Sequence, residues 1–311
     1  MTGKPHVEVL VAGDLFLDLV MTGFESWPNP GEESFAKEFH KEVGGGAAIT
    51  ACCLSKLGVR ASVLGVVGRS DGQWMLDELS KRGVDASWIQ MDEDEPTAFT
   101  VSVSTARDRA LFTYGGANRK LPPTLDSIAD LAKRTGARHI HLAHAVNPGH
   151  AESLFQAIHD AGCTVSLDVG WHPEWLSDPE AIAALKMVDV FFPNLREASE
   201  ISKEKEPRCV LEGLGRMGLR CVALKMGGEG AALLCNEELM FQEPGRVVAV
   251  DTTGAGDCFD AGFLYAWLRE MSPRLCLKAG AACGQASVRV MGGVNGTPTR
   301  EELETLLCAA Q

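Results

Sequence analysis

The sequence of 311 residues contains no long apolar run and carries little positive charge. A helix that spans a bilayer needs about 20 mainly apolar residues, and no such run is present. The 29 lysines and arginines stand against 42 aspartates and glutamates, which gives a net charge of −13. Because nucleic acids and anionic membranes attract positive surfaces, we expect neither as a partner. The N-terminal stretch MTGKPHVEVL lacks the basic and apolar regions of a signal peptide, so we expect a cytoplasmic protein.

The ten cysteines show no spacing typical of a disulfide framework. No Cys-x-x-Cys pair occurs, and a chain of this length needs no covalent cross-links to stabilise its core. Most of these cysteines lie in apolar strand or helix contexts, as Cys52, Cys163 and Cys276 do. We therefore expect reduced thiols that serve as small apolar side chains in a cytoplasmic protein.

Two motifs that resemble functional sites lie in the wrong context. The glycines of Gly213-Leu-Gly-Arg-Met-Gly218 end a helical stretch and precede a strand, whereas a dinucleotide fingerprint follows a strand and opens a helix. The histidines of His139-Ile-His-Leu-Ala-His144 have no cysteine or carboxylate at a ligand-like spacing. We expect packed or hydrogen-bonded histidines there instead of a metal site. A G-x-x-x-x-G-K-[ST] loop is also absent, which excludes a P-loop enzyme.

Short apolar runs alternate with amphipathic segments along most of the chain. The runs that predict buried strands are His6–Ala12, Ala61–Val67, Arg138–Ala143, Cys163–Leu167, Val188–Phe192 and Cys221–Leu224. The segments that predict helices are Ala47–Leu57, Gly72–Arg82, Leu125–Thr135, Ala151–Ala161, Pro207–Met217, Ala255–Glu270, Pro273–Val290 and Arg300–Ala309. This alternation predicts an α/β fold, a three-layer sandwich whose mainly parallel central sheet has helices on both faces.

Two separate stretches, Leu15–Val43 and Thr97–Tyr114, alternate apolar and polar residues without an intervening helix. Within them, Phe35–Lys41 has the period of a strand, and Phe99–Thr105 followed by Arg109–Tyr114 predicts a hairpin. Two β segments inserted in an α/β core favour one small antiparallel sheet, which could serve as a lid or as a dimerisation surface. The alternative is an extension at the edge of the main sheet.

The strongest chemical signal is the segment Val250-Asp-Thr-Thr-Gly-Ala-Gly-Asp-Cys-Phe-Asp-Ala-Gly-Phe263. Apolar residues lead into a Thr/Gly turn, and a helix begins at Gly254-Ala-Gly256. Unencumbered N–H groups and the positive end of the helix dipole form an anion hole suited to a phosphoryl group in transfer. Asp257 lies in the first helical turn, where it is placed to act as a base beside that hole. The alternative is a plain helix cap with a glycine turn.

The run Asp251-Thr-Thr-Gly-Ala-Gly-Asp257 resembles the C-terminal signature of the ribokinase-like (PfkB) carbohydrate kinases. Other segments resemble family motifs in the family's order: Gly13–Asp18, the diglycine signature Gly44–Ala51, the lid hairpin Arg107–Asn118, the N-x-x-E element Pro193–Glu197 and the nucleotide loop Lys225–Gly230. The family fold is an α/β sandwich with a β lid made of two separated segments. The resemblance thus implies a nucleotide-binding core of residues 1–14, 44–96 and 119–311 and a discontinuous lid of residues 15–43 and 97–118.

The resemblance also implies an ATP-dependent kinase that phosphorylates a primary hydroxyl of a sugar or sugar derivative. The implied catalytic residues are the base Asp257 and the anion-hole residues Gly254, Ala255 and Gly256. The implied sugar-binding residues are Asp18, Gly44, Gly45, Gly46 and Asp257. The implied nucleotide-binding residues are Asn194, Glu197, Lys225, Gly227 and Gly230, with Glu197 holding Mg²⁺ through water. Asp251 and Thr253 match positions that bind a monovalent cation such as K⁺ in several members. For Asn194, Glu197 and Asp18 the alternative is a plain cap of a helix or strand end.

Three positions depart from the family pattern. Ile49 stands where many sugar-specific members have Asn, so an amide that would contact hydroxyl groups is missing. The loop Asp168–His172 lacks the usual Asp-x-Asn-x-Arg, and its Trp171 could stack on a ring or simply pack. Lys225 replaces a common Thr, and it could contact a phosphate, which we favour, or be solvent-exposed. These differences leave a nucleoside kinase as an alternative, while the intact Asp257 argues against a non-catalytic sensor. The open edges and apolar faces of the lid predict a homodimer.

Overall fold

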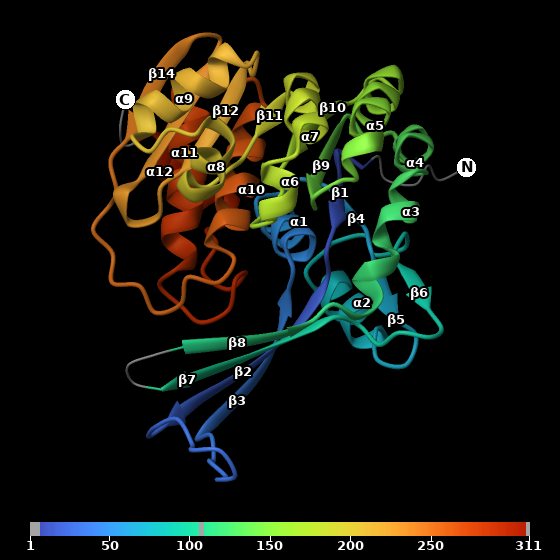
Figure 1. The fold of residues 1–311 in the computed structure, drawn as a ribbon, viewed down its shortest axis with the longest axis vertical. Coiled ribbons are helices and arrows are strands. Elements are labelled where there is room, and N and C mark those ends of the chain that lie inside the picture. The colour runs from blue at the N-terminus through green and yellow to red at the C-terminus, as the bar shows by residue number, and fades with distance from the viewer. Residues whose placement is uncertain (1–6, 106–108, 309–311) are drawn as a thin grey trace.

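Eight strands form the central sheet in the computed structural model, which describes residues 7–105 and 109–308. Their order across the sheet is β14 (Glu238–Gln242), β13 (Ala231–Cys235), β12 (Cys221–Lys225), β11 (Val190–Phe191), β10 (Thr164–Leu167), β9 (His139–Ala143), β1 (Val9–Gly13) and β4 (Ala61–Leu64). Neighbours from β12 to β4 are parallel, and β13 and β14 add an antiparallel edge. The prediction of a mainly parallel sheet is confirmed (Figure 1).

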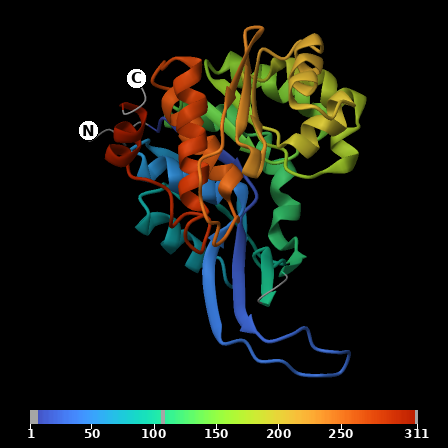
Figure 2. The ribbon, with the colours of Figure 1, turned by 90° about the vertical axis from the view of Figure 1, so that its left-hand side faces the viewer.

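Helices cover both faces of this sheet because its strands alternate their side chains between two apolar cores. In β1, Val9 and Val11 belong to one core, and Leu10 and Ala12 belong to the other. The first core is covered by α1 (Gly46–Lys56), α2 (Gln73–Lys81), α10 (Ala255–Trp267), α11 (Pro273–Ser287) and α12 (Arg300–Cys308). The second is covered by α3 (Leu121–Leu125), α4 (Ile128–Thr135), α5 (Pro148–Asp160), α6 (Pro173–Leu176), α7 (Pro179–Ala184), α8 (Leu195–Ser202) and α9 (Pro207–Arg216), with the short turns η1 (Gly116–Lys120) and η2 (Leu185–Met187). The predicted three-layer sandwich is therefore confirmed (Figure 2). Within the described part of the chain, no helix combines the length and apolarity needed to cross a bilayer.

Some predicted elements are divided in the structure. The run Ala61–Val67 is interrupted at Gly65, where a Cβ would lie only 2.6 Å from Cδ1 of Leu15. Its second half becomes β5 (Val66–Gly68), which pairs with β6 (Gln90–Asp92) in a separate two-stranded sheet. The predicted helix Leu125–Thr135 is likewise divided between α3 and α4. Periodicity alone does not locate such breaks, because it does not register close contacts with distant residues.

The two stretches without helical periodicity meet in a second sheet of four strands, in the order β3 (Glu38–Gly44), β2 (Phe16–Phe24), β7 (Phe99–Thr105) and β8 (Arg109–Tyr114). Its outer pairs are antiparallel, as predicted, but the central pair β2–β7 is parallel. Both central strands start from the same end of the core, where the Leu17 N–H donates to the Ala98 carbonyl at 2.9 Å. This small sheet projects from the body of the molecule and does not extend the main sheet (Figure 1, Figure 2).

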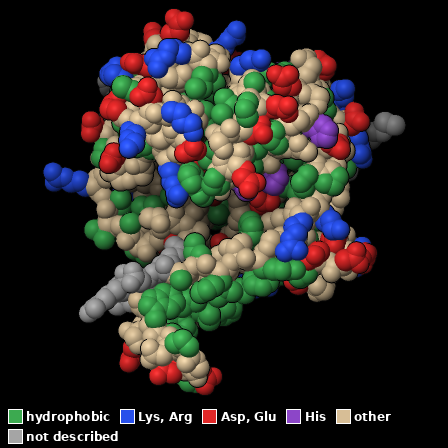
Figure 3. All heavy atoms as spheres, viewed as in Figure 1, with side chains coloured by type: hydrophobic (Ala, Val, Ile, Leu, Met, Phe, Trp, Pro, Cys, Tyr) green, Lys and Arg blue, Asp and Glu red, His purple; other side chains and the backbone are tan. Residues whose placement is uncertain are grey.

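The small sheet has one apolar face and one polar face. Strand pairing aligns Leu19, Val101 and Phe112 on the first face and Asp18, Thr100 and Thr113 on the second. Apolar side chains gather along this sheet in Figure 3, and Phe112 on its apolar face is 60% exposed. The polar face of the small sheet carries Asp18, which lies against Gly44, while the apolar face is open to solvent.

Candidate active site

Several parallel strands end at one edge of the main sheet, and polar residues follow them. β1 ends at Gly13 and β9 at Ala143, and a Cβ on Gly13 would overlap the Ala143 carbonyl. β12 ends at Lys225, and Asp168 follows β10 directly. Ligand sites of open α/β sheets lie at this carboxyl edge. It is here that the structure brings many of the predicted site residues together.

Helix α10 begins at this edge, directly after the Thr/Gly turn. Gly254 has a φ of +69°, a left-handed conformation that glycine adopts without strain. A Cβ on Gly254 would lie 2.8 Å from Cδ1 of Ile49, so Ile49 packs against this turn. The Ala255 N–H donates to the Thr252 carbonyl at 3.3 Å, whereas the next N–H groups of a first helical turn have no partner within the helix. Together with the helix dipole they make residues 254–257 suited to bind an anion.

Asp257 lies in the first turn of α10 and is partly buried. Burial and the nearby charges of Asp168 and Asp18 raise its pKa to about 7, while the Lys225 ammonium opposes this shift. A carboxyl group with this pKa exchanges its proton near neutral pH, as a general base must. The Thr50 hydroxyl donates to the backbone carbonyl of Asp257 at 3.3 Å and so ties α1 to α10.

The glycines at the start of α1 lie between Asp18 and Asp257. A Cβ on Gly44 would overlap the Asp18 carboxylate, and a Cβ on Gly46 would lie 3.1 Å from Oδ1 of Asp257. Gly45 has a φ of +91°, and backbone atoms fill the position of its missing Cβ. Side chains at these positions would displace one carboxylate or the other. The structure therefore brings together the residues that the sequence assigned to the sugar and the residue that it assigned to proton transfer.

Lys225 is not solvent-exposed, contrary to one of the two expectations for it. Its Nζ lies 2.7 Å from Oδ2 of Asp168 and 3.1 Å from Oδ1 of Asp260. Burial opposes the charge of Lys225, but these two carboxylates outweigh burial and raise its pKa. A Cβ on Gly256 would lie 3.4 Å from the same Nζ. The ammonium group thus holds two carboxylates together directly beside the turn at Gly254–Gly256.

Sequence reasoning did not assign a role to Asp168 or Asp260. Carboxylate oxygens of these two residues and Asp257 lie within 4.8 Å of one another. Burial raises the pKa of Asp260, and Lys225 opposes that rise. The sequence held one indication of this cluster. Asp257 and Asp260 are three residues apart, which places them on the same face of a helix. Their pairing with a lysine on β12 could not be read from spacing, since the partners come from different elements.

Asn194 and Glu197 form a capping box at the start of α8. The Asn194 N–H donates to Oε2 of Glu197 at 2.8 Å, and the Glu197 N–H donates to Oδ1 of Asn194 at 3.0 Å. Burial and the charge of Asp168 raise the pKa of Glu197. A backbone bridge pairs Asn194 with Lys225. Asn194 and Glu197 therefore do cap helix α8, as the alternative interpretation expected. The two residues also lie next to Lys225 and Asp168.

Gly227 and Gly230 shape the exposed turn that joins β12 to β13 through η3 (Gly227–Glu229). Their φ values of +58° and +95° lie in the region that favours glycine. Nothing lies within 4 Å of a Cβ on Gly227, whereas a Cβ on Gly230 would overlap the Gln242 carbonyl. The turn follows Lys225 closely, so it extends the same edge of the sheet toward solvent.

Asp251 organises the turn before α10. Its Oδ1 accepts hydrogen bonds from the N–H of Thr253 at 3.0 Å and from the Thr253 hydroxyl at 2.7 Å. Its Oδ2 accepts from the N–H of Gly292 at 3.1 Å. Asp251 and Thr253 therefore link the anion-binding turn to the segment after α11.

The two motifs that lay in the wrong context have structural roles. His139 Nε2 lies 2.8 Å from the Ser166 hydroxyl, and so does Nδ1 of His141. His139 Nδ1 lies 2.8 Å from the Thr164 hydroxyl. The residues Gly213–Gly218 end α9 and precede β12, the order expected from the sequence. These histidines are hydrogen-bonded as expected.

Comparison with known proteins identifies the family. The family model described as pfkB family carbohydrate kinase matches residues 8–300. The chain is 30% identical over 285 residues to the 2-dehydro-3-deoxygluconokinase of Bacillus subtilis (strain 168), covering 87% of this chain and 88% of that protein. It is 30% identical over 304 residues to the ATP-dependent ribose-1-phosphate kinase of Halopiger xanaduensis, covering 97% and 98% of the two chains. The structure of Arabidopsis thaliana ribokinase complexed with ribose and ATP matches with a TM-score of 0.85 and 26% identity, covering 97% of this chain and 99% of that one.

The ribokinase-like fold, together with the match to a kinase family over most of the chain, defines a phosphotransferase. The chain belongs to the pfkB family of carbohydrate kinases. It is therefore a sugar kinase, and the predictions of family, fold class and enzyme class are confirmed.

Proposed function

We propose that the protein transfers the terminal phosphoryl group of ATP to a primary hydroxyl of a sugar or sugar derivative, with Asp257 as the base. The observation that carries this proposal is the position of Asp257 at the start of α10. Its carboxyl group, with a pKa of about 7, stands beside the anion-binding turn and next to Gly46. One small molecule between Asp18 and Asp257 would present a hydroxyl to the base while its other hydroxyls contact Asp18.

The chemistry follows from these positions. Asp257 takes the proton of the acceptor hydroxyl while that oxygen bonds to the terminal phosphorus of ATP and the bond to the ADP oxygen breaks. Residues 254–257 meet the negative charge on the transferring group with N–H donors and the positive end of α10. Asp18 accepts hydrogen bonds from other hydroxyls of the acceptor, and the absence of a side chain at Gly44 lets the Asp18 carboxylate lie against the backbone there.

We assign the nucleotide side of the site to Asn194, Glu197, Lys225, Gly227 and Gly230. A magnesium ion fits here through water, because both Glu197 carboxylate oxygens already accept from Asn194, at 2.8 and 2.6 Å. Burial is the main cause of the raised pKa of Glu197, and the charge of Asp168, which a divalent cation would offset, adds to it. When bound, Mg²⁺ would offset the negative charge of the phosphates. Lys225 adds a positive charge on the side of the anion-binding turn.

We further propose K⁺ binding at Asp251 and Thr253. Their oxygen atoms belong to the turn that leads into α10, so a cation there would rigidify the anion-binding residues. Rates in KCl and NaCl at equal ionic strength test this, and equal rates in the two salts would contradict it.

We assign residues 15–43 and 97–118 to a lid and residues 1–14, 44–96 and 119–311 to the core. The support is Asp18, which lies on the polar face of the small sheet and against Gly44 of the core. Closure of such a lid over the sugar would exclude water and so limit hydrolysis of ATP.

The apolar face of the small sheet supports a homodimer in which this face packs against a second copy. Phe39 and Phe112 on this face are 61% and 60% exposed, and apolar surface of this kind is usually covered. Size-exclusion chromatography with light scattering is expected to give a dimer for the wild type and a monomer for Phe112→Glu. Leu111→Glu is the matched control, because Leu111 is 57% exposed but points to the opposite face. A wild-type monomer would contradict the proposal.

A cytoplasmic location is supported by the ten cysteines, all of which are free thiols. Oxidising compartments favour disulfides in secreted proteins, and reducing ones keep thiols free. Fractionation of cells with an antibody against the protein tests this location.

The test of function is an ADP-release assay with a panel of sugars, sugar acids and nucleosides. Asp257→Asn is expected to abolish turnover and to leave ATP binding largely intact, because the amide cannot take a proton. Asp178→Asn, a change at the cap of α7, is the control and is expected to keep wild-type turnover. Full phosphorylation by Asp257→Asn would contradict the mechanism.

A nucleoside acceptor is the second candidate, and Trp171 is the observation that favours it. Its ring is 40% exposed just after β10, with the Arg196 guanidinium 3.5 Å from the ring centroid. The remaining ring face could stack on a base. Ile49 no longer supports this candidate, since it packs against Gly254. If the acceptor is a nucleoside, Trp171→Ala raises KM for nucleosides alone. Thermal stabilisation by free sugars and not by nucleosides would exclude this candidate.

A further inference from the structure

Two cysteines face each other at the end of β12 that is remote from Lys225. Strand pairing aligns Cys221 on β12 with Cys235 on β13. The Asn236 N–H donates to the Arg220 carbonyl at 2.9 Å, so the adjacent cysteine pair is one of the non-hydrogen-bonded pairs of the ladder. In such pairs the α-carbons lie about 4.5 Å apart, within the range of about 4.4–6.8 Å that disulfides span. The backbone is therefore already placed for a cross-strand disulfide.

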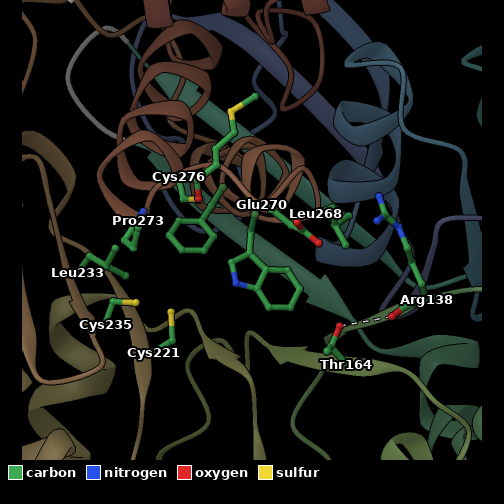
Figure 4. Close-up of a pocket in the computed structure, with 12 residues that line it drawn as sticks. Arg138, Thr164, Cys221, Leu233, Cys235, Leu268, Glu270, Pro273 and Cys276 are labelled. Carbon is green, nitrogen blue, oxygen red and sulfur yellow. Dashed lines mark hydrogen bonds between the residues drawn. The ribbon is translucent and has the colours of Figure 1, made fainter. Parts of the chain in front are cut away.

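Both cysteines line a cavity of about 410 Å³ between the β12–β13 hairpin and helices α10 and α11. Figure 4 shows their sulfur atoms side by side, with Cys276 of α11 apart from them, near Pro273. Each of the two is partly exposed, so a small molecule can reach the pair through the cavity.

The two thiols differ in reactivity because each changes the pKa of the other. The interaction with the Cys221 thiol lowers the pKa of Cys235 to about 7, and the same interaction, with burial, raises the pKa of Cys221. Thiolates are the nucleophilic form of cysteine. Cys235 is therefore the thiol that attacks an oxidant, and Cys221 is the thiol that then attacks the oxidised Cys235.

A second close pair shows why proximity alone is not sufficient. The sulfur atoms of Cys53 and Cys258 lie 3.2 Å apart, but both side chains are fully buried. Burial raises the pKa of Cys53 well above its usual range. An oxidant reaches neither thiol, so this pair is an internal control that stays reduced.

We propose that Cys221 and Cys235 form a reversible intramolecular disulfide on exposure to hydrogen peroxide. The Cys235 thiolate attacks one peroxide oxygen, the O–O bond breaks, and Cys235 becomes a sulfenic acid while the released hydroxide takes up a proton to form water. The Cys221 sulfur then attacks the Cys235 sulfur, and the S–OH bond breaks. The displaced hydroxyl leaves with the Cys221 proton as a second water. Two sulfurs thus lose two electrons, which reduce one peroxide to two waters, and a dithiol such as dithiothreitol reverses the cross-link by exchange.

This disulfide would join the open end of the hairpin whose closed end is the turn 227–230. A cross-link between paired strands restricts the unfolded chain more than the folded one. We therefore expect the oxidised protein to unfold at a higher temperature than the reduced protein. Cys221→Ser should show no such difference between oxidised and reduced samples.

The experiment treats the full chain with a small excess of hydrogen peroxide and maps its peptides by mass spectrometry without reduction. The expected result is a loss of about 2 Da, a peptide that links Cys221 to Cys235, and its disappearance with dithiothreitol. Cys276→Ser should retain the linked peptide, whereas Cys221→Ser should leave a sulfenic acid at Cys235 that dimedone captures. Free Cys221 and Cys235 after treatment, or a link that involves Cys276, would overturn the proposal. Because the wild-type peptide map decides the outcome, a variant that folds poorly does not obscure it.

Discussion

Replacing Lys225 by methionine tests how one buried ammonium group controls the pKa of Asp257, the proposed base. Lys225 Nζ lies 2.7 Å from Asp168 and 3.1 Å from Asp260, and oxygens of these two carboxylates and Asp257 lie within 4.8 Å of one another. At an effective dielectric constant of about 20, two like charges 4.8 Å apart repel by about 3.5 kcal/mol. Lys225 compensates this repulsion, and the variant K225M removes the compensation while keeping much of the side-chain volume.

The expected effect on catalysis is a shift of the pH profile. One pKa unit corresponds to about 1.4 kcal/mol, so loss of the cation should move the acid limb of kcat/KM to higher pH by about one to two units. The free energy of unfolding at neutral pH should fall by about 3–5 kcal/mol, because buried carboxylates lose their partner. This loss should shrink as the pH falls, since protonation of Asp168 and Asp260 removes their repulsion.

The assay is ADP release followed across the pH range in which the protein stays folded, with urea denaturation in parallel. Lys225→Arg keeps the charge and should keep the acid limb near that of the wild type. Asp168→Asn removes a negative neighbour of Asp257 and should move the limb to lower pH, the opposite direction. An unchanged limb in K225M, or one displaced to lower pH, would refute the argument, whatever the loss of maximal rate.

Three further outcomes follow from the same site. In the wild type, kcat/KM should rise about tenfold per pH unit below pH 7, because only the ionised Asp257 accepts a proton; a flat profile there would rule out a base with this pKa. The contribution of Asp257 to stability has the opposite sign. Its pKa of about 7 in the folded protein exceeds the ordinary value of 3.8, so the folded state binds the extra proton, and urea midpoints should decline as the pH rises between these values. Gly254→Ala should lower the free energy of unfolding by about 1–3 kcal/mol and lower kcat, because φ is +69° at this residue and Ile49 leaves no space for a Cβ. Wild-type stability in calorimetry and wild-type kinetics would contradict this account of Gly254.

The alternation of apolar runs and helical segments was sufficient to predict the parallel strands of the main sheet and its two helical layers, but it did not predict the antiparallel edge strands β13 and β14. In β1 the run is apolar throughout because successive side chains enter two different cores, which is the pattern of a buried parallel strand. Period-two alternation likewise predicted the strands of the small sheet. The direction of β2 relative to β7 was predicted wrongly, since direction depends on where each strand leaves the core.

The candidate site was predictable where its residues are adjacent in sequence. The segment Asp251–Asp257 contains the turn, the helix start and the carboxyl group in one continuous stretch, so a chemical role could be proposed for it from the sequence alone. The roles assigned to Asp18, Asn194 and Glu197 came from resemblance, and they remain predictions. The pKa of Asp257 could not be predicted from the sequence, because it depends on burial and on charges from other elements.

The sequence by itself determined the family and the layered α/β architecture, and it located the turn at Gly254–Gly256 that we propose as an anion site, because each depends on local periodicity or on a contiguous motif. Only the tertiary structure decided that Lys225 holds Asp168 and Asp260, and that Cys221 faces Cys235 at a reachable cavity. These groups come from strands and helices far apart in the chain, or from the register of two strands. Short-range forces such as ion pairing, desolvation and thiol contact act only when folding brings such residues within a few ångströms, a distance that spacing along the chain does not encode.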